Sequence, residues 1–296
     1  MRTSQRDVSK ELNAMLESSE ALMLTQLCDS DHERLNTLMQ YHLASGGSRT
    51  RARLAIQAGN SIGLDAQTCT SLAACCELVH NASLLHDDIQ DGDRQRRGRE
   101  AAWSLFDINT AMCAGTLMLS TAFSVISLIK QPTGLLTTHL HQRIADLICG
   151  QTLDLACTAQ SIDMQTYLNI ATRKSGSLLA LPLELVMIAA QDHEAVPVAK
   201  AAGESFAVAY QIADDCQDVS QDLARGHCNI IGLMKSAGVS TTHATTEALS
   251  LAQHYLAQAE RHAADLPDDS GALLINLCNQ LRMNILSEGR LDCETV

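Results

Sequence analysis

Apolar residues recur along the chain at the spacing of three and four that is typical of amphipathic helices, in segments of about 10 to 30 residues. Polar stretches that contain glycine or proline separate these segments; they are SGGSR at 45–49, GNSIG at 59–63, DGDRQRRG at 91–98, KQPTG at 130–134 and DLARGHCN at 222–229. We find no convincing strand alternation. The pattern predicts an all-α protein.

Two aspartates and one proline are expected to shape the ends or the course of particular helices. Asp65 is expected to cap the helix that ends near residue 90, and Asp163 the helix that begins at Met164. Pro182 is expected to bend the apolar helix that starts near Ser175.

One segment is long enough to cross a bilayer, because residues 110–129 carry no charge. Its hydroxyl side chains weaken that interpretation; they are Thr110, Thr116, Ser120, Thr121, Ser124 and Ser127. We therefore expect a central helix that is buried on all sides, and no stable membrane insertion.

Composition supports helices, since 46% of the 296 residues are apolar but only 3% are aromatic, and there are 4 prolines. Nothing divides the chain, so we expect one domain over residues 1–296. The formal charge of −13 argues against a nucleic-acid partner. The 11 cysteines show no CxxC spacing, and the N-terminus lacks an apolar signal segment, which together favour a cytoplasmic protein.

An acidic pattern occurs twice, as HDDIQD at 86–91 and ADDCQD at 213–218. On a helix, Asp87 and Asp91 lie on one face about 40° apart, and Asp88 stands about 100° to the side. Asp214, Asp218 and Asp215 repeat this arrangement. Carboxylates at a helix C-terminus repel one another and oppose the helix dipole, so a cation must compensate them. A set of oxygen ligands without histidine or thiolate suits Mg²⁺.

Basic residues follow the first acidic cluster; they are Arg94, Arg96, Arg97 and Arg99. Their guanidinium groups suit phosphate oxygens, and SGGSRTR at 45–51 adds two glycines and two arginines. Taken singly, a DDxxD motif is more often a solvated helix end and a basic loop an ordinary surface loop. The repetition favours a magnesium and diphosphate site. Lys174 fits either a phosphate contact or a surface lysine beside a cap.

The motifs resemble those of a known family. SLLHDDIQDGDRQRRG and YQIADDCQD are similar to the two aspartate-rich motifs of the all-trans isoprenyl diphosphate synthases. GGSRTR at 46–51, GQTLDL at 150–155 and KSG at 174–176 match further blocks in the right order, so the resemblance extends from about Ser45 to Asp222.

The resemblance implies a single large helical bundle around a deep central cavity, the isoprenoid synthase type, and usually a homodimer. It implies that Mg²⁺, in three ions, activates an allylic diphosphate. The diphosphate leaves, the double bond of isopentenyl diphosphate attacks the resulting allylic cation, and loss of a proton gives a product that is five carbons longer.

The resemblance also assigns roles to residues. The leading metal ligands are Asp87, Asp91 and Asp214, supported by Asp88, Asp215 and Asp218. The allylic diphosphate is held by Arg96, Lys174, Ser175 and Gln211. Isopentenyl diphosphate is held by Gly47, Arg51, His80 and Arg97.

Three positions depart from the family pattern. Ser48 stands where the family has a lysine, His227 and Cys228 stand where it has Gly-Lys, and Thr116 follows Gly115 where it has aspartate. These departures leave two alternatives open: a terpene cyclase or other allylic-diphosphate enzyme on this fold, and a regulatory subunit of a heterodimeric synthase. The presence of Arg51 and His80 favours elongation, and both acidic motifs are intact, unlike the pattern expected of a regulatory subunit.

Product length depends on side chains along the helix before Asp87. Ala82 and Ser83 are too small to block a C15 chain, so the stop is expected lower down, at Phe123, Met118 or Leu119. We therefore expect a C20 product, geranylgeranyl diphosphate, with C15 as the nearest competitor.

Overall fold

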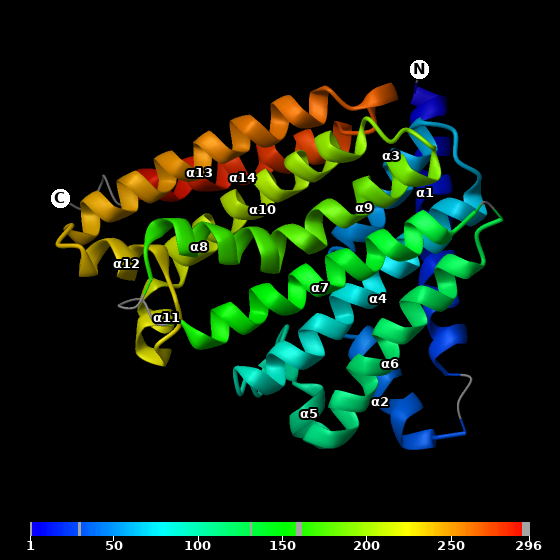
Figure 1. Cartoon of the computed structure of the whole chain (residues 1–296), viewed down its shortest axis with the longest axis horizontal. Helices are drawn as coiled ribbons and strands as arrows, with labels where there is room; N and C mark the ends of the chain where they lie inside the picture. The colour runs from blue at the N-terminus through cyan, green and yellow to red at the C-terminus, as the bar shows by residue number, and fades with distance from the viewer. Residues whose placement is uncertain (1, 29–30, 131, 158–161, 292–296) are drawn as a thin grey trace. The chain divides into compact units, whose positions relative to one another are not determined.

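The computed structural model describes residues 2–28, 31–130, 132–157 and 162–291, with side chains described between residues 10 and 286. These residues are almost entirely helical, which confirms the all-α prediction (Figure 1). The chain divides into two compact units, residues 1–141 with 185–192 and residues 142–184 with 193–296. The prediction of one domain with a central cavity stays a prediction.

The first unit contains most of the N-terminal half. Its elements are α1 (Arg2–Leu27), α2 (Glu33–Leu43), α3 (Thr50–Ser61), α4 (Ala66–Gln90), β1 (Gln95–Arg96), β2 (Arg99–Glu100), α5 (Ala102–Leu105) and α6 (Ile108–Ser127). Two further helices, α7 (Gly134–Ala156) and α9 (Ser177–Ala189), continue from one unit into the other.

Helix α4 is the centre of the first unit, with α1, α3 and α6 packed against it. The carboxylate of Asp65 caps its N-terminus by accepting a hydrogen bond from the Thr68 N–H at 3.0 Å, as predicted. Leu72, Leu78 and Leu85 are at most 1% exposed. Because small residues such as Ala74 and Cys75 fill the faces between them, α4 is buried over most of its length and ends as a rigid support for the acidic motif.

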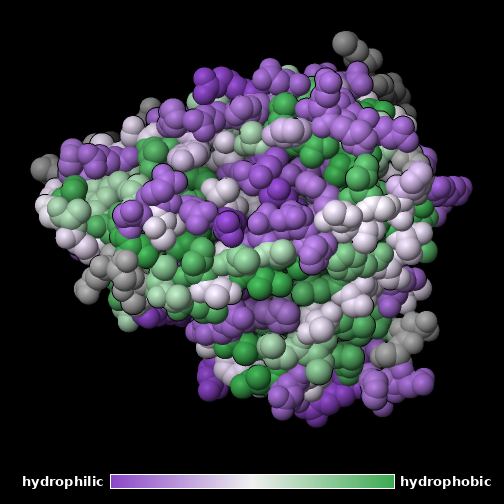
Figure 2. All heavy atoms as spheres, in the orientation of Figure 1, coloured by the Kyte–Doolittle hydropathy of each residue, from purple (hydrophilic) through white to green (hydrophobic). Residues whose placement is uncertain are grey.

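Helix α6 runs beside α4, but it is not buried on all sides, so that prediction is wrong (Figure 1). Met118 and Ala122 are fully buried, whereas Ile108 and Met112 are 50% and 41% exposed. Figure 2 shows apolar side chains over this helix on the viewed surface. Among the described residues, α6 alone has the length and hydropathy of a membrane span, and 44% of that window is buried inside the protein. Its buried stripe is that of a core helix.

The basic loop after α4 forms a small antiparallel hairpin, which the sequence did not predict. Residues Gln95 and Glu100 pair, as do Arg96 and Arg99. Arg97 and Gly98 turn the chain with φ angles of 53° and 73°. Two residues per strand are too few to show the alternation of apolar and polar residues, so the sequence pattern could not predict this hairpin.

The second unit is formed by α8 (Met164–Ala171), a π-helical turn η1 (Thr172–Gly176), α10 (Val196–Gln217), α11 (Val219–Arg225), α12 (Ile230–Ser236), α13 (Thr241–Ala264), η2 (Pro267–Asp269) and α14 (Ala272–Leu291). Figure 1 shows α10, α13 and α14 side by side. Asp163 caps α8 by accepting from the Thr166 N–H at 2.8 Å, as predicted. Pro182 lies inside α9.

Small residues let the helices of the second unit approach closely. Ala244, Ala248 and Ala252 line one buried face of α13. In α10, a Cβ on Gly203 would lie 2.6 Å from the backbone nitrogen of Ala180, so a side chain there has no room. This close contact fixes α10, which carries the second acidic motif, against α9.

Candidate functional site

The first acidic motif closes α4. The N–H of Asp91, the C-terminal cap, donates to the carbonyl of Asp87 at 2.8 Å. Both side chains are partly exposed, whereas the side chain of Asp88 is 1% exposed. The structure therefore separates the three aspartates as helix geometry predicted, with Asp88 turned inward.

Asp88 is paired with Arg96. The guanidinium donates from Nε to Asp88 Oδ1 at 2.7 Å, and a second donation comes from the terminal nitrogen. The other carboxylate oxygen, Oδ2, is buried without a hydrogen-bond partner. Burial raises the pKa of Asp88, and Arg96 offsets part of that rise. The hairpin thus places a cation beside the buried carboxylate, next to the partly exposed Asp87 and Asp91.

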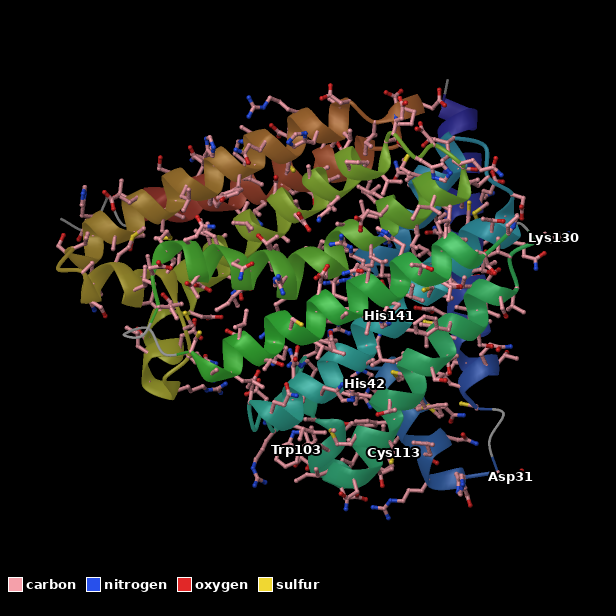
Figure 3. The ribbon with its side chains drawn as sticks, in the orientation of Figure 1. Asp31, His42, Trp103, Cys113, Lys130 and His141 are labelled. Carbon is pink, nitrogen blue, oxygen red and sulfur yellow. The ribbon has the colours of Figure 1, made fainter. Side chains whose placement is uncertain are left out.

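The four predicted arginines divide into two pairs. Arg94 lies over the Trp103 ring at 5.6 Å, and Arg99 lies over the Tyr41 ring at 4.3 Å. Trp103, labelled in Figure 3, also donates from Nε1 to the Asp93 carbonyl at 2.8 Å. These stacking contacts hold the hairpin by cation–π attraction. Arg96 and Arg97 instead contact Asp88 and the Gly46 carbonyl.

The turn before α3 meets this hairpin. Gly47 has a φ of +128°, and a Cβ placed there would lie 2.7 Å from the guanidinium carbon of Arg97. Arg97 also donates to the Gly46 carbonyl. Glycine suits this position because residues with a side chain rarely adopt its φ angle. Gly47 and Arg97, predicted together for isopentenyl diphosphate, are therefore in contact.

Arg51 and His80, the remaining members of that set, lie in the same region of the first unit. Arg51 and Arg97 both act on the imidazole of His80, and burial together with these cations lowers the pKa of His80 well below its usual value. The neighbouring Glu77 is 2% exposed and accepts from the Ala52 N–H at 3.1 Å. Glu77 therefore joins α4 to α3 beside the basic residues.

Two of the departures have clear surroundings. The hydroxyl of Ser48 is exposed and pairs with the Thr50 hydroxyl at 2.7 Å. Thr116 is exposed and donates to the Met112 carbonyl at 2.9 Å. Neither residue supplies a charge to the cluster.

The second acidic motif closes α10 in a similar way. The N–H of Asp218 donates to the Asp214 carbonyl at 3.0 Å, and both side chains are exposed. Partial loss of solvent, followed by the charges of Asp218 and Asp222, raises the pKa of Asp214. This accumulation of carboxylates, which raises the pKa of Asp214, favours a cation at this helix end.

Asp215, the middle aspartate, is 2% exposed and accepts three hydrogen bonds. Tyr167 and the Ile230 N–H donate to Oδ2, each at 2.8 Å, and Gln211 donates to Oδ1 at 2.8 Å. Burial raises its pKa to about 7, although these donors act in the opposite direction. Its partners are neutral groups, unlike the arginine beside Asp88.

Asn229 fixes the loop that follows the second motif. Its side-chain nitrogen donates to the Asp215 carbonyl at 2.7 Å and to Asp222 Oδ2 at 2.8 Å. Its side-chain oxygen caps α12 by accepting from the Ile231 N–H at 2.9 Å. Sequence reasoning missed Tyr167 and Asn229. An asparagine directly before an apolar run is a recognisable cap, but no sequence signal joins Tyr167 to Asp215.

The π-helical turn η1 carries two predicted diphosphate ligands. Lys174 Nζ lies 2.5 Å from Asp154 Oδ2, and Ser175 Oγ lies 3.3 Å from Gln211 Oε1. A Cβ on Gly150 would lie 2.6 Å from the Lys174 nitrogen, so α7 and η1 touch through their backbones. Single π turns often occur at functional sites. Asp154, in the GQTLDL block, was not among the predicted site residues.

Within the described part of the chain, no three histidine, cysteine or acidic side chains converge as a ready-made metal site. This arrangement still fits Mg²⁺, which takes one or two carboxylates and completes its shell with water and phosphate oxygens. The exposed oxygen donors at both helix ends match that demand. Asp88 and Asp215 fit less well as metal ligands, because both carboxylates are buried and already accept hydrogen bonds, from Arg96 and from Tyr167.

Comparison with known proteins agrees with this chemistry. Residues 32–227, about two thirds of the chain, match the polyprenyl synthetase family. A geranylgeranyl diphosphate synthase of Mycobacterium tuberculosis is 29% identical over 270 residues, covering 82% of this chain and 76% of the relative. A farnesyl diphosphate synthase of Escherichia coli is 30% identical over 254 residues, covering 82% of each.

Solved structures show the same fold. A decaprenyl diphosphate synthase from Rhodobacter capsulatus has a TM-score of 0.84 at 21% identity, covering 95% of this chain and 99% of the other. A polyprenyl synthase from Caulobacter crescentus, complexed with calcium and isoprenyl diphosphate, has a TM-score of 0.81 at 22% identity, covering 92% and 97%. We conclude that the chain belongs to the polyprenyl synthetase family of isoprenyl diphosphate synthases, which are trans-prenyltransferases.

Proposed function

We propose that the chain joins an allylic diphosphate to isopentenyl diphosphate in a Mg²⁺-dependent reaction, with geranylgeranyl diphosphate as the main product. The observation that carries this proposal is the end of α4, where Asp87 and Asp91 lie beside the Arg96 and Arg97 hairpin. Partly exposed carboxylates next to guanidinium groups suit a magnesium diphosphate, because the carboxylates attract the metal and the arginines attract the phosphates.

We assign the metal-ligand roles according to the exposure of the aspartate side chains. We assign the metal to Asp87 and Asp91 at one helix end and to Asp214 and Asp218 at the other. Bound Mg²⁺ supplies charge stabilisation for the departing diphosphate. Asp88 and Asp215 support the ligands by holding the hairpin and the loop after α10, as their bonds to Arg96 and Tyr167 indicate.

The remaining residues bind and orient the diphosphates. Asp154 holds Lys174, and the Ser175, Gln211 and Asp215 side chains form one hydrogen-bonded series on the second unit. A lysine fixed by a carboxylate needs less ordering when an anion arrives. We assign Lys174, Ser175 and Gln211, with Arg96, to the allylic diphosphate. Arg51, His80, Arg97 and Gly47 are assigned to isopentenyl diphosphate.

Product length rests on the apolar face of α4. Ala82 is fully buried, and Ser83 is 9% exposed with its hydroxyl bonded to the His80 carbonyl at 2.8 Å. On α6, which packs against α4, Met118 is fully buried. Small side chains one turn before Asp87 support a C20 product. Ala82→Phe should shift the main product to C15 or shorter, and an unchanged product length in a folded variant would contradict this tail path.

We also propose a homodimer. Leu105, Ile108 and Met112 are 47%, 50% and 41% exposed on α5 and α6. The exposed Cys113, labelled in Figure 3, follows Met112 on α6. Such a surface suits a second copy of the chain. Light scattering should give twice the chain mass for the wild type and a lower mass for Met112→Glu; a monomeric wild type would refute the dimer.

Product analysis tests the reaction itself. The enzyme is incubated with Mg²⁺, isopentenyl diphosphate and each of the C5, C10 and C15 allylic diphosphates, with a chelator control. Extended diphosphates ending at C20 are expected. Hydrocarbons or alcohols formed from the allylic substrate alone would instead show a cyclase, which the exposed Ser48 favours. No conversion without a partner chain would indicate a regulatory subunit.

A further inference from the structure

His42 is a buried histidine that no predicted role explains. It lies in the last turn of α2 and is 4% exposed, and Figure 3 labels it. Its Nε2 is buried without a hydrogen-bond partner, and so is Nδ1 of the neighbouring His80. A buried polar nitrogen that lacks a partner destabilises the folded protein, so two of them in one place indicate that a ligand completes the site.

The surroundings of both imidazoles are cationic. Burial, then Arg97, Arg96 and Arg49, lower the pKa of His42 to about 4, while Asn81 acts in the opposite direction; the Oδ1 atom of Asn81 is also buried without a hydrogen-bond partner. Arg51, Arg97, His42 and Arg96 act on His80. The acidic groups that act on Arg97 are Glu77 and Asp88, and these accept bonds from the Ala52 N–H and from Arg96. The arginines of this cluster outnumber its carboxylates, and that balance of charge suits an anion.

The end of α2 is held firmly in this position. Arg49 donates to the Leu43 carbonyl at 3.0 Å, to the Gly46 carbonyl at 3.1 Å and to Glu20 at 2.6 Å. Arg97 donates to the same Gly46 carbonyl. One network thus joins the residue after His42 to the glycine turn and the hairpin, so His42 has a fixed place beside Arg97.

Ser48 explains why an extra donor is needed. The family has a lysine there, whereas Ser48 is exposed and paired with the Thr50 hydroxyl. A serine supplies no charge to a diphosphate. An imidazole that gains a proton can do so, because a bound anion reverses the field of the surrounding arginines and favours the charged form.

We propose that His42 is a further ligand of the isopentenyl diphosphate site, donating a hydrogen bond from Nε2 to a phosphate oxygen and replacing the charge that is absent at Ser48. This inference rests on the proposed function for the identity of the substrate. Binding of the diphosphate draws a proton from solvent onto the His42 and His80 pair.

Steady-state kinetics provide the first test. His42→Leu should raise KM for isopentenyl diphosphate about 10- to 100-fold, the range expected for losing a hydrogen bond to a charged group, and leave KM for the allylic substrate nearly unchanged. His42→Gln, which keeps a donor but cannot be protonated, should have a smaller effect. Adding Ser48→Lys to His42→Leu should restore much of the affinity. His254→Gln, on the exposed side of α13, is the matched control.

Calorimetry with inorganic pyrophosphate tests binding without turnover. Titrations at pH 7.5 in two buffers of different ionisation enthalpy should show uptake of about one proton by the wild type and clearly less by His42→Gln. Equal uptake in both proteins would overturn the proton-linked role. Equal changes in both Michaelis constants, or an unchanged KM in folded His42→Leu, would overturn the ligand role. Binding that depends on His42 in an enzyme that makes no extended product would uphold the site and refute the proposed function.

Discussion

The two acidic helix ends share the sequence DDxQD, but the structure compensates their middle aspartates differently. Asp88, at the end of α4, is paired with the guanidinium of Arg96. Asp215, at the end of α10, accepts hydrogen bonds from the neutral groups of Tyr167, Gln211 and the Ile230 backbone. In both motifs the flanking aspartates point to more exposed surroundings.

The difference teaches what the shared motif requires. Both ends need a buried middle aspartate that fastens the following loop, but only the first brings a cation with it. The guanidinium of Arg96 offsets part of the rise that burial causes in the pKa of Asp88, whereas neutral donors leave Asp215 with a pKa of about 7. We therefore expect substitutions at the flanking aspartates to act alike in the two motifs and substitutions at the middle aspartates to act differently.

The largest effect is expected where the motifs are alike. Asp87→Ala and Asp214→Ala should each lower kcat at least about a hundredfold, because each removes a ligand of the cation that stabilises the departing diphosphate. Asp265→Ala, at the exposed end of α13, is the control. Full activity in excess chelator, or near-normal turnover by either variant, would contradict the metal assignment.

The next prediction concerns pH. The native pKa of Asp215 lies above its ordinary value of 3.8, so the native state binds more protons than the unfolded state between about pH 4 and 7. This contribution to stability is fully present below about pH 4 and is lost as the pH rises through about 7. A rise of that size corresponds to roughly 4 kcal/mol at most. Urea unfolding in metal-free buffer should show a flatter decline with pH for Asp215→Asn; identical slopes would count against it.

Loss of the Asp88 charge should have a smaller effect on stability. Asp88→Asn leaves Arg96 without its counter-charge, and because Arg96 is 30% exposed we expect a loss of about 1–3 kcal/mol at pH 7. Asp215→Asn, whose partners are neutral, should be neutral or stabilising at the same pH. Equal destabilisation by the two substitutions would remove the distinction between the motifs.

The smallest effect is expected at Tyr167. Tyr167→Phe removes one hydrogen bond to Asp215 and should lower the free energy of unfolding by about 1 kcal/mol at pH 8, where Asp215 is ionised. At pH 5 the loss should be smaller, since the protonated carboxyl depends less on a donor. Tyr255→Phe on α13 is the control; a loss that does not depend on pH would show that Tyr167 acts through packing alone.

Local sequence features predicted the helices and their caps well, because Asp65 and Asp163 act within their own helical turn. The separation of Asp87 and Asp91 from Asp88 also followed from helix geometry. The sequence could not reveal that Tyr167 reaches Asp215, since this contact joins residues 48 positions apart. The sequence did not distinguish Arg94 and Arg99 from Arg96 and Arg97. In the structure the first two are distinguished by their stacking on aromatic rings.

Non-local contacts also explain two further features that the sequence did not predict, the exposed face of α6 and the surroundings of His42. The exposed face of α6 was unexpected because uncharged serine and threonine residues tolerate both burial and solvent. His42 lies in no recognisable sequence motif. Only its position near Arg97 and Asn81 distinguishes it from an ordinary core histidine. Chemistry that depends on neighbours from other helices is therefore the part that the sequence conceals.

Our central proposal is that both acidic motifs contribute to the same ionisation step, and a double-mutant cycle tests it most directly. We would measure kcat for Asp87→Ala, Asp214→Ala and the double variant with saturating Mg²⁺, isopentenyl diphosphate and farnesyl diphosphate. If both ends hold metal at one diphosphate, the double variant should lose little more than the weaker single variant, because residues that act as a unit are not additive. Losses that multiply independently would contradict the account.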